Sequence, residues 1–261
     1  MGREPTVVER VVRLDDAFFR VVSAQDPARS GDPAFVLIHG IGTSHRSMTR
    51  LHRELARTSA VHSIDLPGFG GLPKPSSSIS VHGMAAALAS VLDHLGVTSA
   101  VLVGHSMGAQ WVVELAASRP DLAAGVVIIG PVADDAHRTT SAQSAALFWD
   151  SVGEPPSANA VVFLDYLRCG PIWFLKQLRH MITYPIEVRV SAMRAPLLVL
   201  RGGNDPIAST GWCRELRSRA RRGSFVVVPG NRHVVQFSAA STVASAIRAF
   251  VIRELTGDRG L

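Results

Sequence analysis

Residues 104–108 read Gly-His-Ser-Met-Gly, so a serine is flanked by glycines in the pattern G-x-S-x-G. The apolar run AVLV directly precedes this motif, and the helical pattern MGAQWVVELAAS begins within it. Such a strand–turn–helix setting exposes the serine at the tip of a tight turn, because glycines let the strand and the helix approach closely. We therefore predict that Ser106 is a nucleophile.

A nucleophilic serine needs a neighbouring base, which is most often a histidine. Three histidines follow Ser106 in the chain, namely His137, His180 and His233. His233 lies in the turn PGNRHV after the last apolar strand pattern, where it can reach back over the strand ends. The other two lie in a segment that interrupts the alternation of strands and helices. His233 is therefore the predicted base.

The base in turn needs a carboxylate that orients it. Asp205 follows the apolar run LLVL in the turn RGGNDP and precedes His233 by 28 positions, which leaves room for one helix and one strand. Asp134 and Asp135 follow the preceding strand pattern and stand as alternatives. Asp205 is the predicted acid.

Attack on a carbonyl places negative charge on its oxygen, which backbone amides can stabilise. The sequence HGIG at 39–42 follows the strand pattern AFVLI and predicts one such donor at the amide of Ile41. The amide of Met107, at the positive start of the next helix, is the predicted second donor. His105 is expected to be a packing or hydrogen-bonding residue, because in so tight a turn it faces away from Ser106.

Short apolar runs alternate with longer helical patterns along most of the chain, which predicts an α/β domain with a doubly wound, mostly parallel sheet. The expected strands are Thr6–Val12, Phe18–Val22, Ala34–His39, Ala60–Asp65, Ala100–Val103, Val126–Ile129, Leu197–Leu200 and Phe225–Val228. The expected helices are Met48–Arg57, Val81–Leu95, Met107–Ser118, Gly211–Arg221 and Ala239–Leu255. The first two strands alternate with charged residues, so they are expected to form a solvated antiparallel edge.

Residues 131–193 interrupt this order, since they are too many for a single crossover helix. They hold seven of the 16 aromatic residues, which favours a helical cap over an apolar pocket. The alternative is that these aromatics only attach a small helical subdomain to the sheet. We expect residues 1–130 and 194–261 to form the core. The candidate pocket residues are Phe69, Phe148, Trp149, Tyr166, Trp173 and Phe174.

Composition excludes several classes of protein. The chain has 261 residues, of which 47% are hydrophobic and 18% are charged. This composition excludes general disorder, and a chain of this length buries enough surface to fold without disulfides. Its net charge of +6 comes from arginine, and the densest arginine cluster, at 214–222, has no interleaved aromatics, which favours a solvated face over a nucleic-acid site. Two cysteines predict neither a disulfide framework nor a zinc site, and a cytoplasmic location is expected. No apolar run is long enough to span a bilayer, and the charged N-terminus does not resemble a signal peptide.

The motifs HGIG, DLPGFG, GHSMGA, RGGNDP and GNRH occur in an order that resembles the α/β-hydrolase superfamily, over about Val7 to Leu255. The resemblance implies an eight-stranded sheet with helices on both faces and a helical cap inserted after the sixth strand. It also implies a Ser106–His233–Asp205 triad, an oxyanion hole from Ile41 and Met107, and neither a metal nor an organic cofactor.

Departures from individual subfamilies narrow the expected chemistry. Epoxide hydrolases and haloalkane dehalogenases share the DLPGFG turn but carry Asp at the position of Ser106. Hydrolases of carbon–carbon bonds usually have Asn before the serine and Trp after the histidine, where this chain has His105 and Val234. Cofactor-free haloperoxidases usually have an aromatic residue at the position of Ile41.

The leading hypothesis is a serine hydrolase that cleaves an ester or thioester of a small to medium apolar substrate through an acyl-enzyme. The alternatives are carbon–carbon bond hydrolysis on the same triad and a ligand-binding receptor with little turnover. The expected partner is a small molecule rather than a nucleic acid, and the sequence favours neither a monomer nor a homodimer.

Overall fold

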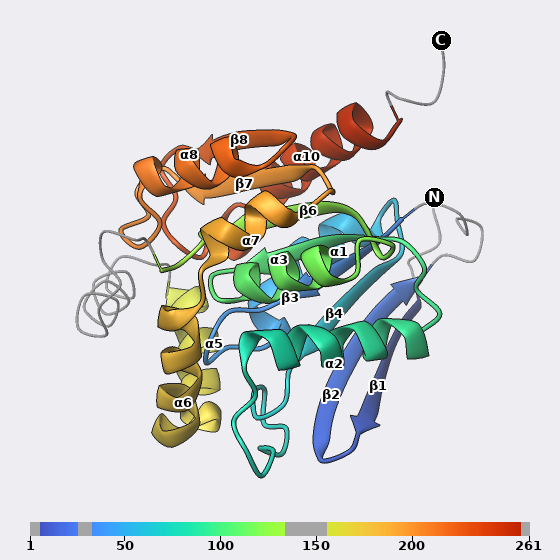
Figure 1. Cartoon of the computed structure of the whole chain (residues 1–261). Coiled ribbons are helices and arrows are strands. Elements are labelled where there is room, and N and C mark those ends of the chain that lie inside the picture. Colours follow the sequence, from blue (N-terminus) through green and yellow to red (C-terminus); the bar gives the residue numbers. More distant parts are fainter. Residues whose placement is uncertain (1–5, 26–32, 134–155, 257–261) are drawn as a thin grey trace.

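Eight strands form one twisted sheet that lies between layers of helices, and Figure 1 shows this arrangement in a computed structural model. The structure describes residues 6–25, 33–133 and 156–256. The strands are β1 (Thr6–Leu14), β2 (Ala17–Gln25), β3 (Ala34–Ile38), β4 (Val61–Asp65), β5 (Ala100–His105), β6 (Ala123–Ile129), β7 (Leu197–Gly202) and β8 (Gly223–Val228). All eight predicted strands are confirmed, with ends that shift by a few residues.

The strand order is β1-β2-β4-β3-β5-β6-β7-β8. Strands β1 and β2 pair in antiparallel fashion with each other, and β2 pairs likewise with β4, whereas every pair from β4 to β8 is parallel. The apolar runs predict this, since parallel strands are buried on both faces. Val7 and Val11 of the edge strand β1 are largely exposed, which confirms the predicted solvated edge.

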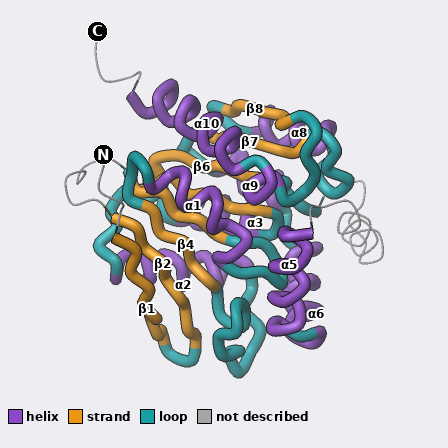
Figure 2. The backbone as a smooth tube through the Cα atoms, turned by 180° about the vertical axis from the view of Figure 1, so that it is seen from behind, coloured by secondary structure: helices purple, strands orange, loops and turns teal. Residues whose placement is uncertain are grey.

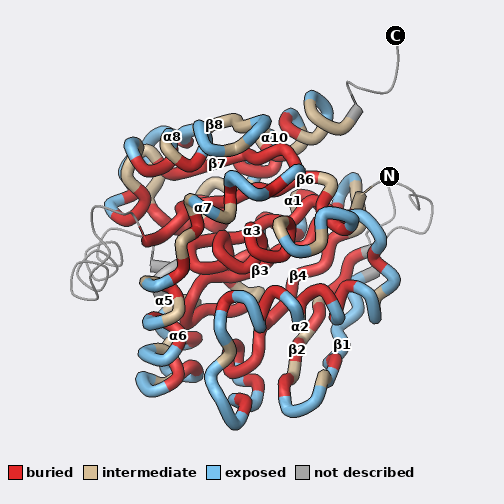
Figure 3. Tube along the Cα trace, in the orientation of Figure 1, coloured by how far each residue is buried: buried red, intermediate tan, exposed pale blue. Residues whose placement is uncertain are grey.

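Helices cover both faces of the sheet, as the opposite views in Figure 1 and Figure 2 show. On one face lie α2 (Val81–His94), α3 (Gly108–Ser118), α7 (Ile186–Ala192) and α8 (Thr210–Arg219), and on the other α1 (Thr49–Ala56), α9 (Val235–Ser238) and α10 (Ala240–Val251). Two single-turn elements, η2 (His45–Met48) and η4 (Ile252–Thr256), adjoin α1 and α10. Figure 3 shows that burial concentrates in the sheet between these layers.

Alternate residues of the central strands enter opposite halves of the core. In β3, Val36 and Ile38 pack on the α3 face, whereas Phe35 and Leu37 pack on the α1 face. This alternation follows from the two-residue repeat of a strand, and all four side chains are buried because both faces are covered. The sheet is therefore a rigid base for the turns at its strand ends.

A helical insert follows β6, as expected, and contributes α5 (Pro156–Cys169) and α6 (Pro171–Thr183) before α7. Glu114 of α3 fastens the end of this segment, since its carboxylate accepts bonds from the Tyr184 hydroxyl at 2.6 Å and the Arg189 Nε at 2.7 Å. Residues 134–155 lie outside the described residues. None of the helices that the structure describes combines the length and apolar character needed to cross a bilayer.

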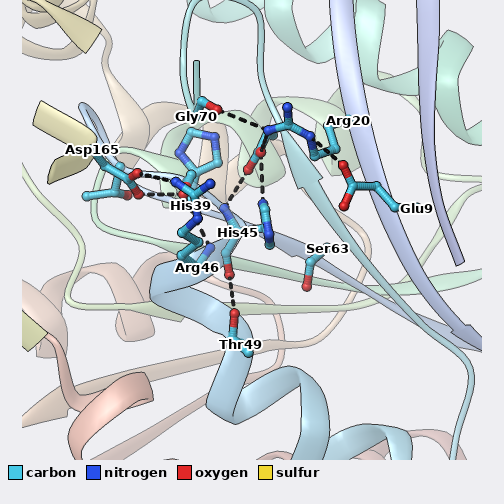
Figure 4. Close-up of polar contacts among 12 residues, drawn as sticks. Glu9, Arg20, His39, His45, Arg46, Thr49, Ser63, Gly70 and Asp165 are labelled. Atoms are coloured by element: carbon cyan, nitrogen blue, oxygen red, sulfur yellow. Dashed lines mark hydrogen bonds and ion pairs between the residues drawn. The ribbon is translucent and has the colours of Figure 1, made fainter. Parts of the chain in front are cut away.

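Two carboxylates without solvent exposure, Asp65 and Asp165, hold the segment that links β3 to α1. Figure 4 shows His45 and Arg46 of this segment between Arg20 and Asp165. Asp65, at the end of β4, accepts bonds from the main-chain amide of His45, from the His45 Nδ1 at 2.8 Å and from the Arg20 Nη1 at 2.9 Å. Burial alone would raise the pKa of Asp65, but its bonds to His45 lower that pKa below the usual carboxyl value. Asp65 therefore fixes this segment to the sheet as an ionised group.

Asp165 joins the same segment to the helical insert. This carboxylate lies on α5 and accepts a bond from the Ser44 hydroxyl, one from the Arg46 Nη1 at 3.0 Å and one from the Arg168 Nη1 at 3.2 Å. Its side chain is fully buried, whereas the two guanidinium groups are about 40% exposed. A buried charge needs such partners, and Asp165 therefore attaches the insert to the loop after β3.

Replacing Asp165 with Ala should lower the free energy of unfolding by about 2–3 kcal/mol, because three bonds to a buried carboxylate are lost while the arginines can return to water. Asp121→Ala is the control, since its carboxylate is 60% exposed and pairs with Arg119 at the surface. That change should cost less than about 1 kcal/mol. Urea unfolding of both variants measures the difference. Equal effects would mean that the insert does not depend on the buried carboxylate.

Candidate active site

Ser106 occupies a strained turn between β5 and α3. Its φ is +56°, in the left-handed region that side-chain-bearing residues rarely adopt. A Cβ on Gly104 would lie 2.3 Å from the Gly108 carbonyl oxygen, and one on Gly108 would lie 2.5 Å from the Ile38 carbonyl oxygen. The two glycines are therefore required for the strand, the turn and the helix to meet. The amide of Ser106 bonds the carbonyl of Ile129 in β6 at 2.9 Å, which holds the turn against the sheet.

Asp205 and His233 meet at the same end of the sheet, in the turns after β7 and β8. The His233 Nδ1 lies 3.0 Å from the Asp205 Oδ2, and both side chains are buried. The other carboxylate oxygen, Oδ1, accepts bonds from the amides of Ile207 at 2.8 Å and Ala208 at 3.0 Å. The two sequence-predicted residues are thus brought together.

The charge state of Asp205 determines which nitrogen of His233 carries a proton. Burial alone would raise the pKa of Asp205, but the His233 ring and the two amide bonds lower it below the usual carboxyl value. An ionised carboxylate only accepts hydrogen bonds, so the proton must be on the His233 Nδ1. The neutral ring then has its lone pair on Nε2, the nitrogen that a base uses in a serine triad.

Gly130 makes room for this pair at the end of β6. Its φ is +56°, and a Cβ there would lie 2.9 Å from the His233 ring and 3.2 Å from the Asp205 Oδ2. The sequence does not predict this role for Gly130, because a glycine after an apolar run indicates only that a strand ends. Of the rival residues, His180 lies beside the Ser78 hydroxyl at 3.3 Å. The rivals Asp134, Asp135 and His137 lie outside the described residues.

The loop after β3 passes beside the turn that holds Ser106. A Cβ on Gly40 would lie 2.9 Å from the Ser106 Cβ. The Gly40 carbonyl accepts bonds from the His39 Nδ1 at 2.7 Å, the Thr43 hydroxyl at 3.0 Å and the Thr43 amide at 3.3 Å. In a trans peptide the next N–H points opposite to the carbonyl. These three donors therefore turn the Ile41 amide away from themselves and fix its direction.

His39 is a structural residue in this arrangement. Its Nδ1 donates to the Gly40 carbonyl, and its Nε2 accepts a bond from the Leu66 amide at 3.2 Å, which together require a neutral ring. Burial lowers the pKa of His39, in agreement with that state. Met107, the other predicted amide donor, caps the N-terminus of α3, where the helix dipole favours negative charge.

The predicted pocket residues fall into two groups. Phe69 and Trp173 are buried, and their rings pack against each other at 6.4 Å, with Phe69 also against His39 and Trp111. Tyr166 and Phe174 are half-buried and cover Gly42, where a Cβ would lie 2.3 Å from the Tyr166 ring and 3.2 Å from the Phe174 ring. Phe148 and Trp149 lie outside the described residues.

A metal site is not apparent in the part of the chain that the structure describes, since no three His, Cys, Asp or Glu side chains there are grouped to hold an ion. Cys169 and Cys213 are buried, and neither forms a disulfide within the described part of the chain.

Comparison with known proteins agrees with this fold. A bifunctional biotin biosynthesis protein of Cellvibrio japonicus is 26% identical over 84% of this chain, which covers 47% of that protein. The chain spans about half the length of the curated relatives it matches. The fold superposes on a thermophilic esterase from Thermogutta terrifontis with a TM-score of 0.77, at 20% identity and with 95% and 98% of the two chains covered. It superposes on 2-hydroxy-6-oxo-6-phenylhexa-2,4-dienoate hydrolase of a Rhodococcus strain with a TM-score of 0.74, at 17% identity and with 97% and 99% covered.

The family comparison covers most of the chain. Residues 35–246, which extend from β3 into α10, match the model of the alpha/beta hydrolase family. The eight-stranded, mostly parallel sheet and the helical insert after β6 both lie where that fold has them. The chain is a member of the α/β-hydrolase family.

Proposed function

We propose that this α/β hydrolase cleaves a carboxylic ester or thioester through an acyl-enzyme on Ser106. The observation that carries the proposal is the 3.0 Å contact of the His233 Nδ1 with the buried Asp205 carboxylate, at the sheet edge where Ser106 occupies a left-handed turn. A pure binding protein has no need for an oriented imidazole beside a strained serine. Backbone strain of this kind persists mainly where function requires it.

In the first half of the reaction, the Ser106 Oγ attacks the substrate carbonyl carbon while the His233 Nε2 takes the hydroxyl proton. The carbonyl π electrons move to the oxygen, and the amides of Ile41 and Met107 stabilise this oxyanion. Asp205 stabilises the resulting imidazolium. The oxyanion then re-forms the carbonyl, and the alcohol or thiol leaves with the proton from His233.

In the second half, water attacks the acyl-enzyme carbonyl and gives its proton to His233. Collapse of that intermediate releases the carboxylic acid and returns the proton to Ser106. The direction of the Ile41 amide supports this assignment, because the three bonds to the Gly40 carbonyl fix it before substrate arrives. A donor that needs no reorganisation stabilises the transition state most effectively.

The proposed substrate has a small to medium apolar portion. Tyr166 and Phe174 support this, since their half-buried rings lie 5.6 Å apart over Gly42, one residue beyond the proposed oxyanion donor. An acyl or alcohol chain beside these rings would be removed from water. Trp173 and Phe69 are proposed to support the pocket from behind, because both are buried in the core cluster.

The catalytic assignment predicts two losses of activity. Ser106→Ala should lower kcat by about 10⁴- to 10⁶-fold on whichever ester the wild type hydrolyses best. Asp205→Asn should lower kcat by about 10⁴-fold, because the amide favours the wrong imidazole tautomer. A panel of p-nitrophenyl esters, thioesters and lactones of graded length supplies the rates, and thermal melting checks that each variant folds. Activity retained in the folded Ser106→Ala variant would exclude the mechanism.

The pocket assignment predicts that two adjacent residues of α6 differ in role: one affects substrate preference and the other affects stability. Phe174→Ala should change the ratio of kcat/KM for short and long acyl esters by a factor that corresponds to ~1–3 kcal/mol, the usual effect of a hydrophobic pocket contact. Trp173→Ala should instead lower the free energy of unfolding by about 3–5 kcal/mol, because Trp173 is buried. Acyl-length profiles and urea unfolding of both variants test this. An unchanged profile in Phe174→Ala would place the pocket wall elsewhere.

A further inference from the structure

His105 lies next to Ser106 but contacts the opposite side of the proposed triad. Its Nε2 is 3.1 Å from the main-chain carbonyl oxygen of His233, and the two imidazole rings lie 4.8 Å apart at an angle of 50°. A carbonyl oxygen only accepts hydrogen bonds, so the His105 Nε2 carries the proton and donates it. The nucleophile turn is therefore joined directly to the main chain of the proposed base.

The environment of the other ring nitrogen, Nδ1, indicates that His105 is present for the bond that its Nε2 makes. Nδ1 is buried, and among the described residues it has no hydrogen-bond partner. Burial and the nearby His233 lower the pKa of His105 to about 3, so the ring is neutral at any pH where the triad would work. A residue that only filled this space would be better apolar, because a buried nitrogen without a partner is unfavourable. The donor on Nε2 is what an apolar residue would lack.

A second hydrogen bond holds the loop that carries His233, on the side of Asp205. The Asn204 amide donates to the Asn231 carbonyl at 2.8 Å, which ties this loop to the turn that holds Asp205. The hydrogen bond from His105 to the His233 carbonyl holds the same loop on the side of Ser106. Between the two anchors the His233 side chain is bonded to Asp205. The base is thus held from both turns between which it would transfer a proton.

We propose that His105 is a positioning residue, whose Nε2–H fixes the main chain of His233 and so sets its ring between Ser106 and Asp205. The proposal rests on the proposed function, since it assigns His105 a part in that triad. Displacing a reacting group by about 1 Å can lower a rate about 100-fold, so loss of this anchor should reduce kcat. KM should change little, because His105 is buried and its ring is bonded to the main chain of His233.

Two variants separate the donor from the ring. His105→Leu fills the space without a donor, and His105→Gln restores an N–H at the same number of bonds from Cα. With a p-nitrophenyl ester, Leu should lower kcat by about 10- to 100-fold, whereas Gln should stay within about 3-fold of the wild type. His52→Leu is the matched control. His52 is also buried, with one ring bond, to Ser63 at 2.8 Å, and one nitrogen without a partner in the described structure. It should change the melting temperature but not kcat.

The pH profile supplies a readout that a packing role would not move. Within the described part of the chain, the titratable groups that face His105 are His233, Asp205 and His39. A loosened His233 would bond Asp205 less well, so its protonated form would lose stabilisation. The acid limb of kcat/KM should therefore shift to lower pH in His105→Leu and return in His105→Gln. Unchanged kcat and pH profile in the Leu variant, or equal losses in both variants, would overturn the proposal.

A spectroscopic measurement keeps this inference separate from the proposed function. The His233 Nδ1 proton, bonded to Asp205, should give a downfield proton resonance in the wild type that broadens by exchange in His105→Leu and sharpens again in His105→Gln. If the wild type hydrolyses no ester, the proposed function fails while this comparison still tests the anchor. A resonance that is equally sharp in all three proteins would contradict the role of His105.

Discussion

Parallel pairing of β5 to β8 brings together the side chains proposed to react, because it ends these strands at one edge of the sheet. His105 pairs with Ile129, Ile129 with Leu200, and Gly202 with Val228, so the turns that follow β5, β7 and β8 lie in one row. Each turn then contributes one of Ser106, Asp205 and His233. An antiparallel neighbour would direct its turn to the opposite edge.

The close approach of these turns requires unusual backbone conformations and places polar groups out of contact with water. Ser106 and Gly130 have left-handed φ values, and Gly40 and Gly108 leave no room for a Cβ. Polar groups excluded from water here are compensated by specific bonds, such as those of the Asp205 carboxylate to two amides and an imidazole. The strain and the burial are both supported by the apolar sheet behind them.

The helical insert is connected, through the loop after β3, to the sheet edge that carries Ser106, Asp205 and His233. Asp165 of α5 bonds Ser44 and Arg46, and Tyr166, the next residue, covers Gly42. Asp65 holds the same loop from the sheet side through His45. The loop that carries the proposed Ile41 donor is therefore fixed between insert and sheet, so substrate contacts made by the insert would act beside the oxyanion.

Local patterns predicted the sheet and the candidate triad because each depends on neighbouring residues. The strand–turn–helix context of Ser106 and the turns around Asp205 and His233 are visible within a few positions, and parallel topology then brings them together. The role of Asp165 could not be predicted, since its partner Ser44 is 121 positions away. The same holds for Gly130 and for the bond from His105 to His233, which exist only once three turns meet. Helical phase also left open which of Trp173 and Phe174 is buried, and packing against Phe69 buries Trp173.

The proposed mechanism requires that His233 activates Ser106 and no other serine. Covalent labelling with a fluorophosphonate, followed by intact mass and peptide mapping, measures this activation, because only a serine with a positioned base reacts quickly. We expect one adduct per chain, on the peptide that contains Ser106, and loss of that adduct in a folded His233→Ala variant. A wild-type protein that remains unlabelled, or an adduct on another residue, would contradict it.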